Sequence, residues 1–473
     1  MKTLLWSVPI ATGAILSSII YINYQSKSTK PRDDPDSESN ICENIDEINE
    51  SNFQNVYELF LTGFSFSETL TCMLWRQSIN DTIPQIKTYL HVKNEIDYIS
   101  SGLIFYGLTQ NNICAIYSSN KPEYLILQLA LTVQSMIAST LYDSFGSDAI
   151  TYIVKLAEFD AIFVDNEKRL RRIVNVLKEN KFKIKLIISL INIPKDVLDE
   201  CENNNFKIVT YQELEMIGRN NPVPHNVSFS FMIRSICRIG GPSKKHDVYT
   251  IYFTSGTSGN PKGVELMHKN FISTVLSLSA FTEKKSNPFS FGIDDILLSY
   301  LPAAHIYEGT AELVMVYKGG KIAYYGGNIK EIVNDSQFFK PSIYPTVPRI
   351  MNRVYDMTMA ALSQSFIKRT IFNIAYYWKR TTLNNGVYNS PLLDKFVFSK
   401  IISEKLGGNL RLITTGSAPI SPKVLEFWRI VSGACHMITD NYHYNVNNDV
   451  IQGYGLTETC SSSNLQMTRS IEL

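Results

Sequence analysis

The chain has 473 residues, of which 44% are hydrophobic and 19% charged, and its formal net charge is +1. A chain of this length and composition can bury more than one core, and the lack of a basic excess argues against nucleic acid as a partner. The seven cysteines are odd in number and form no Cys-x-x-Cys pair, which suits a reducing compartment and argues against a disulfide framework or a zinc site.

Residues 1–24 contain an uncharged apolar stretch from Leu4 to Ile22. A helix rises about 1.5 Å per residue, so this stretch nearly matches the ~30 Å of bilayer hydrocarbon. We expect an uncleaved membrane anchor; a signal peptide is the alternative, although the stretch is longer than a typical signal core. Three basic residues at positions 27–32 follow the stretch and only Lys2 precedes it, so the positive-inside rule places the body of the protein in the cytoplasm.

The rest of the chain divides into a linker and a folded body. Residues 25–51 are polar, with prolines and acidic side chains, and predict a flexible linker to a body over residues 52–473. From about residue 112, short β-rich runs alternate with helical runs, which is typical of βαβ units and a parallel sheet. Strands are predicted at 112–117, 137–141, 161–165 and 185–189, and helices at 123–134 and at 148–157 with Ser147 as N-cap. A second α/β lobe is predicted to begin near the loop after residue 254, with helices at 268–278 and 310–317 and strands at 295–301 and 321–325.

The segment 249–263 (Tyr-Thr-Ile-Tyr-Phe-Thr-Ser-Gly-Thr-Ser-Gly-Asn-Pro-Lys-Gly) predicts a strand that ends in a phosphate-binding loop. Its three glycines permit positive φ, so that backbone N–H groups can converge on an anion, while hydroxyls add donors and Lys262 adds charge. Pro261 and Gly263 flank the lysine, which argues against a Walker A loop; a Ser/Gly-rich surface turn is the alternative. The residues expected to hold phosphate are Thr254, Ser255, Gly256, Thr257, Ser258, Gly259 and Lys262.

A second motif, Gly-Tyr-Gly-Leu-Thr-Glu-Thr, occupies residues 453–459. Glycines on both sides of Tyr454 let the backbone and the ring approach a flat ligand, and Thr457 and Glu458 offer a hydroxyl and a carboxylate. A carboxylate beside a polyphosphate is a usual ligand for Mg²⁺. The alternative is a turn at a strand end with a solvated glutamate.

Together with residues 414–421 (Thr-Thr-Gly-Ser-Ala-Pro-Ile-Ser), these two motifs resemble the core motifs of the adenylate-forming (AMP-binding) superfamily. The segments 301–308 (Leu-Pro-Ala-Ala-His-Ile-Tyr-Glu), 341–353 and 141–154 resemble the long-chain fatty acyl-CoA synthetases in particular. The similarity runs from about residue 50 to the C-terminal end, with the motifs in the family's order. It implies an α/β fold with two βαβ-type lobes and a smaller β subdomain.

The resemblance also implies a two-step reaction, in which a fatty acid carboxylate attacks the α-phosphorus of ATP and the thiol of CoA then attacks the acyl-adenylate. Two anions must meet in the first step, so the protein has to neutralise and position them. The family pattern assigns the β- and γ-phosphates to the loop with Lys262, the α-phosphate to Thr457, and Mg²⁺ to Thr254 and Glu458. The residues expected around the adenine are Gly416, Ser417, Ala418, Pro419, Tyr454 and Gly455.

His305 matches a family histidine near the acyl pocket, but a structural histidine at a strand end is an equal alternative. The helix after it is rich in Ala, Leu, Val and Met, and either lines an acyl tunnel or belongs to the core.

Two features depart from the family. The family continues beyond the Gly-Tyr-Gly motif into a subdomain that carries an aspartate, a hinge and a lysine for adenylation, whereas this sequence ends at Leu473. Loss of one such donor costs about 10²–10³ in rate, so we expect this polypeptide to be a poor catalyst. An Asn-rich insert at 439–449 resembles a translated intron or a surface loop, and with the early end it indicates an incomplete gene model.

The sequence therefore predicts a long-chain fatty acid–CoA ligase that uses ATP, Mg²⁺ and CoA, with an N-terminal membrane anchor, a cytoplasmic body, a location at the endoplasmic reticulum and no nucleic-acid partner. A pseudoenzyme or binding module for nucleotide or fatty acid is one alternative. A ligase for another carboxylic acid is the second.

Overall fold

The computed structural model describes residues 53–66, 68–142, 145–223, 243–254, 260–283, 292–384, 390–403, 405–432, 449–454, 457, 460–461 and 464–466. Within these ranges no helix is both long and apolar enough to cross a membrane. The predicted N-terminal anchor and linker lie outside the described residues, so both stay predictions, as does the location at the endoplasmic reticulum.

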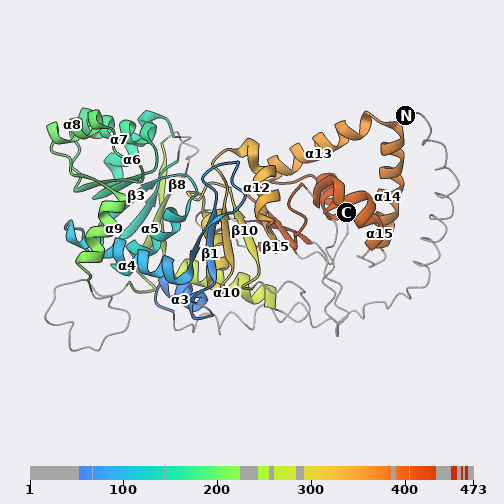
Figure 1. Cartoon of the computed structure of the whole chain (residues 1–473), viewed down its shortest axis with the longest axis horizontal. Helices are drawn as coiled ribbons and strands as arrows, with labels where there is room; N and C mark the ends of the chain where they lie inside the picture. Colours follow the sequence, from blue (N-terminus) through green and yellow to red (C-terminus); the bar gives the residue numbers. More distant parts are fainter. Residues whose placement is uncertain are drawn as a thin grey trace.

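The first sheet has seven strands in the order β7-β6-β5-β3-β4-β8-β9, with β9 antiparallel to β8 and the other neighbours parallel. Figure 1 shows this lobe on the left, with β3 and β8 labelled. Its strands are β3 (Ile113–Tyr117), β4 (Ile137–Thr140), β5 (Ala161–Val164), β6 (Leu186–Ser189), β7 (Ile208–Thr210), β8 (Val248–Thr254) and β9 (Lys262–Met267). The helices of this lobe are α4 (Tyr89–Phe105), α5 (Pro122–Val133), α6 (Ser147–Ala157), α7 (Glu167–Asn180), α8 (Lys195–Asn203) and α9 (Tyr211–Asn220). The central strands are buried almost throughout, as expected when helices cover both faces of a parallel sheet.

The predicted strands and helices of this lobe are confirmed to within about two residues. The predicted cap of α6 was wrong by one position: Gly146 is the N-cap, and Ser147 is the first residue inside the helix. The N-cap has an extended backbone and makes no side-chain capping bond, so the turn does not require the serine hydroxyl there.

The second sheet has eight strands in the order β15-β14-β13-β12-β10-β11-β1-β2, with the antiparallel strands β15 and β2 at its edges. Its strands are β1 (Thr71–Trp75), β2 (Gln85–Thr88), β10 (Ile296–Ser299), β11 (Lys321–Tyr324), β12 (Ile343–Thr346), β13 (Leu412–Thr415), β14 (Asp449–Tyr454) and β15 (Asn464–Gln466). The sequence placed the start of this lobe at the loop after residue 254. In fact β8 and β9 complete the first sheet because β8 pairs with β4, and β1 and β2 join the second sheet from far upstream.

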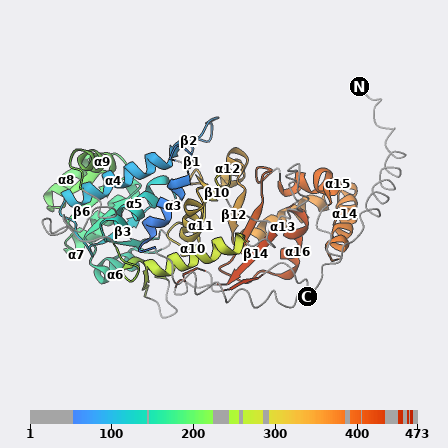
Figure 2. The same ribbon diagram turned by 90° about the horizontal axis from the view of Figure 1, so that it is seen from below.

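Every strand among the described residues belongs to one of these two sheets, so the smaller β subdomain stays a prediction. The remaining helices are α3 (Val56–Phe66), α10 (His268–Glu283), α11 (Ile306–Tyr317), η2 (Ile329–Glu331), α12 (Ile332–Phe339), α13 (Pro348–Ser363), α14 (Phe366–Asn384), α15 (Pro391–Leu393), η3 (Asp394–Ser403) and α16 (Pro422–Val431). Figure 2 shows α13, α14 and α15 at the end of the molecule opposite the helices of the first sheet.

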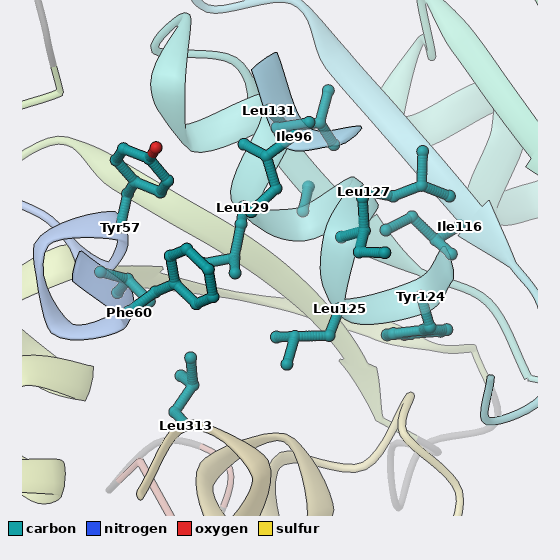
Figure 3. Packing of buried hydrophobic residues seen from close by; sticks show 14 of the residues in the cluster. Tyr57, Phe60, Ile96, Ile116, Tyr124, Leu125, Leu127, Leu129, Leu131 and Leu313 are labelled. Atoms are coloured by element: carbon teal, nitrogen blue, oxygen red, sulfur yellow. The ribbon is translucent and has the colours of Figure 1, made fainter. Parts of the chain in front are cut away.

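One buried cluster joins the two lobes. Tyr57 and Phe60 of α3, Leu125 and Leu129 of α5, and Leu313 of α11 face one another in it (Figure 3), and all of them are almost fully buried. Burial of each large apolar side chain contributes about 1.5–3 kcal/mol. The helix α11, which follows the predicted acyl-pocket histidine, is therefore fixed against helices of the first lobe.

Candidate active site

The predicted phosphate loop lies at the tip of a β-hairpin. Thr254, the last residue of β8, pairs with Lys262, the first residue of β9. Thr254 is half-buried and Lys262 is exposed. The hairpin therefore places a hydroxyl and an ammonium group across from each other, at the carboxyl end of a parallel strand where ligands bind in open α/β sheets.

The centre of this loop, residues 255–259, lies outside the described residues, so the predicted contacts of Ser255, Gly256, Thr257, Ser258 and Gly259 stay predictions. Gly263 was predicted to supply a positive φ. It instead lies within β9, outside the left-handed region. A Cβ there would come within 3.2 Å of Ile251 and of Phe253, so close packing of the hairpin explains the glycine.

The segment expected to border the adenine follows β13 directly. Gly416 is buried, while Ser417, Ala418 and Pro419 are exposed. Ser417 has a φ of 70°, a left-handed conformation that costs a non-glycine residue about 1–3 kcal/mol and is common at ligand sites. The loop then enters α16, where the Ser421 side chain accepts a hydrogen bond from the Val424 amide.

The Gly-Tyr-Gly motif begins at the neighbouring strand end. β14 is parallel to β13, with Thr415 beside Gln452, so Tyr454 at the end of β14 and the loop after Thr415 leave the same edge of the sheet. Gly455 and Glu458 lie outside the described residues, and their roles stay predictions.

The continuation of this motif reaches the first lobe. The Cys460 amide donates to the Thr457 carbonyl over 3.1 Å, and the Thr274 hydroxyl of α10 donates to the Cys460 carbonyl over 3.3 Å. Cys460 is buried in the cluster that also contains Tyr249 and Tyr252 of β8. Burial raises the pKa of Tyr249, and the charges of Glu312 and Cys460 raise it further. The turn after Thr457 is therefore attached to the lobe that carries the phosphate hairpin.

Asn120, which sequence reasoning missed, clamps the loop that leads to His305. It follows β3 of the first sheet and is 6% exposed. Its amide nitrogen donates to the Leu301 carbonyl over 2.5 Å and to the Ser299 hydroxyl over 2.8 Å, and its oxygen accepts from the Ala303 amide over 2.7 Å. A buried residue of one lobe thus fixes the backbone of the other. The available signal was a polar residue in the loop that follows a buried strand, since β3 ends at Tyr117.

His305 is the N-cap of α11, which begins four residues earlier than the sequence indicated. Its ring makes an edge contact with Tyr142, with ring centres 6.0 Å apart. The side chain keeps an accessible face, yet the surrounding protein desolvates the imidazole and lowers the pKa of His305. The imidazole is therefore neutral at pH 7.

Behind His305, α11 turns two carboxyl groups into the protein. Glu308 and Glu312 are one turn apart and are at most 1% exposed. Burial raises the pKa of Glu312 to about 7, although the Ser299 hydroxyl donates to it over 2.7 Å. Burial and the neighbouring Glu312 raise the pKa of Glu308 well above its usual range. This shift favours the protonated, uncharged form of Glu308.

The raised pKa of Glu312 predicts a pH-dependent stability. Between about pH 4.5 and 7 the folded chain holds a proton on Glu312 that the unfolded chain has lost, so the free energy of unfolding falls as pH rises, by up to about 1.4 kcal/mol per unit. Glu312→Gln keeps a neutral side chain and should remove this contribution. Urea unfolding at pH 5, 6 and 7 measures it, and a difference between the two proteins that is the same at every pH would contradict the assignment.

Among the described residues, no three acidic, histidine or cysteine side chains are grouped so that they could hold a metal ion by themselves. Of the predicted site residues that the structure describes, Thr254 and Thr457 offer hydroxyl oxygens, whereas the ammonium group of Lys262 has no lone pair for a metal. This set fits a Mg²⁺ ion that takes most of its oxygen ligands from phosphate and water.

Comparisons with known proteins show what this chain is similar to. The model of a family described as AMP-binding enzyme matches residues 76–472. The chain is 35% identical to the peroxisomal long chain acyl-CoA synthetase 7 of Arabidopsis thaliana over 79% of this chain and 48% of the relative. It is 32% identical to long-chain-fatty-acid–CoA ligase 5 of Rattus norvegicus over 81% of this chain and 53% of the relative. The chain thus spans about half the length of the curated relatives it matches.

Solved structures show the same fold. The adenylation domain of a carboxylate reductase from Mycobacterium chelonae superposes with a TM-score of 0.65 at 14% identity, over 95% of this chain and 64% of that chain. A long-chain-fatty-acid-CoA ligase from Archaeoglobus fulgidus gives 0.59 at 16% identity, over 88% of this chain and 66% of that chain.

Proposed function

Because this chain belongs to the AMP-binding enzyme family, we propose that it activates a long-chain fatty acid with ATP and transfers the acyl group to CoA. In the first step a carboxylate oxygen bonds to the α-phosphorus and pyrophosphate leaves. In the second, the CoA thiolate bonds to the acyl carbon and AMP leaves. The relatives named as long-chain acyl-CoA synthetases and ligases support this substrate class.

One observation supports the proposal. The Thr254–Lys262 pair closes a hairpin of the first sheet, and the turn after Thr457 is hydrogen-bonded through Cys460 to Thr274 of α10, the helix that follows this hairpin in the chain. The phosphate motif and the Gly-Tyr-Gly motif are about 200 residues apart in sequence. Their convergence on one lobe is the arrangement that a shared triphosphate would require.

In this site the chain's own residues neutralise and position charge. Lys262 would offset the charge of the β- and γ-phosphates, and the Thr457 hydroxyl would donate to an α-phosphate oxygen. Thr254 and Glu458 would hold Mg²⁺, which supplies further positive charge to the polyphosphate when bound. Ser417 and its neighbours would border the adenine beside Tyr454.

The acyl side of the site would lie at His305 and the start of α11. The lowered pKa of His305 favours a neutral imidazole there, and the raised pKa of Glu308 favours its uncharged form. This matters because an ionised, buried glutamate would repel the incoming fatty acid carboxylate and raise the barrier to two anions meeting.

Titration of the full chain with Mg²⁺·ATP, followed by palmitate-dependent exchange of pyrophosphate into ATP, tests the proposal. Binding together with palmitate-dependent exchange is expected. Binding without exchange would favour a nucleotide-binding module, and exchange only with aryl or short-chain acids would favour a different ligase. Absence of ATP binding would contradict the nucleotide site itself.

The Asn120 clamp gives a separate prediction for the acyl side. Asn120→Ala removes three hydrogen bonds to the loop before His305, and we expect binding of a fluorescent fatty acid such as cis-parinarate to weaken about 10-fold. Asn204→Ala is the control because it also removes an asparagine hydrogen bond, from its partly buried amide to the Glu200 carbonyl at the C-terminal end of α8. Equal affinity of both variants would show that the clamp does not shape the acyl site.

A further inference from the structure

The helix α14 is apolar on both of its sides. Its inner side packs Phe372 and Ala375 into the second core cluster. Its outer side exposes five large side chains at helical spacing, which are Phe366 (83% exposed), Ile367 (70%), Ile371 (52%), Ile374 (54%) and Tyr377 (71%). At 3.6 residues per turn these five share one face. Contiguous apolar patches of this kind mark an interaction surface.

The segment around this face is strongly basic. From α13 to the end of η3, residues 348–403 contain eight Lys or Arg and two Asp, an excess of six positive charges in a chain whose net charge is +1. Lys379 is ion-paired with Asp394, and Arg380 with Glu426. Lys368 and Arg369 are exposed beside the apolar face.

We propose that the outer face of α14 docks on the surface of a bilayer that contains anionic phospholipids. An amphipathic helix lies in the plane of the interface, with its apolar side chains at the acyl boundary and its basic side chains among the phosphates. A symmetric contact with a second copy would bring the same basic segment against itself, which like charges oppose. Figure 2 shows α14 at one end of the molecule.

This inference goes beyond the proposed function and does not depend on it. It also concerns a surface contact only, since no described helix is long and apolar enough to cross a membrane. A chain that proved inactive on fatty acids could still dock, and an active ligase could fail to do so.

Depth-dependent quenching in the full chain tests the docking. Phe366→Trp places a reporter on the face, and Met216→Trp places one at a 57% exposed position on α9 in the other lobe. Both proteins keep the four native tryptophans and all N-terminal residues, so any contribution from those is common to both. The probes are phosphatidylcholine vesicles with brominated acyl chains, with and without phosphatidylserine.

The added emission is the tryptophan fluorescence of a variant beyond that of the wild type. We expect the added emission of Phe366→Trp to be quenched on vesicles with phosphatidylserine. High salt should relieve this quenching, and so should the further substitutions Lys368→Glu and Arg369→Glu. The added emission of Met216→Trp should be unchanged. Equal quenching at both positions, or none at position 366, would overturn the proposal. A dimer that dissociates on Phe366→Glu, with no quenching, would also overturn it and assign the face to a second copy.

Discussion

Lys262→Ala is expected to lower the rate of ATP–pyrophosphate exchange by about 10²–10³-fold, the usual cost of one preorganised charge at a reacting centre. Lys262 pairs with Thr254 at the open end of the hairpin and is exposed there, so its ammonium group is available to the phosphates. The variant should stay folded, because an exposed lysine at a strand end contributes little to the free energy of unfolding. The lower exchange rate would therefore come from the lost charge.

Lys269→Ala is the matched control, since Lys269 is an exposed lysine at the start of α10, a few residues further along the chain. We expect its exchange rate to stay near that of the wild type. If Lys262→Ala and Lys269→Ala retain the same rate, the assigned role of Lys262 fails even if the chain still binds ATP.

Gly63→Ala is expected to destabilise the fold by more than about 3 kcal/mol. A Cβ at Gly63 would lie 1.7 Å from the Val316 carbonyl oxygen, and backbone cannot move aside as a side chain can. The contact joins α3 to α11, so the helix that begins at His305 would have to shift. Urea unfolding followed by circular dichroism measures the change.

Gly292→Ala is the control for this substitution, because a Cβ there meets nothing within 4 Å and its φ is ordinary. We expect a change within about 1 kcal/mol of the wild type. Equal stabilities for the two alanine variants would mean that α3 and α11 are not packed as closely as described.

Local sequence patterns were sufficient to predict most strands and helices of the first lobe that the sequence analysis addressed. The β-branched run that forms β8 and the alternation from β3 to β6 were predicted because each element carries its own periodicity and length. The pairing of β1 with β11 was not predicted, since these strands are about 250 residues apart and nothing local encodes which strands become neighbours.

The sequence predicted site residues only where they belong to a recognisable motif. Thr254, Lys262 and Ser417 lie at strand ends, as their motifs indicated, whereas the predicted contacts of Glu458 stay untested. Asn120 was missed because its partners are backbone atoms of the other lobe. The burial of Glu308 could not be anticipated, because a glutamate on a helix is usually solvated.

The central claim is that the phosphate hairpin and the Gly-Tyr-Gly motif hold one triphosphate. Calorimetric affinities for Mg²⁺·ATP of Thr254→Val, Glu458→Gln and the double variant test it most directly. If both residues bind the same ion, the two losses should not add. The double variant should then bind Mg²⁺·ATP only slightly more weakly than the single variant with the lower affinity. Losses that simply add would place the two residues at separate positions and contradict the shared site.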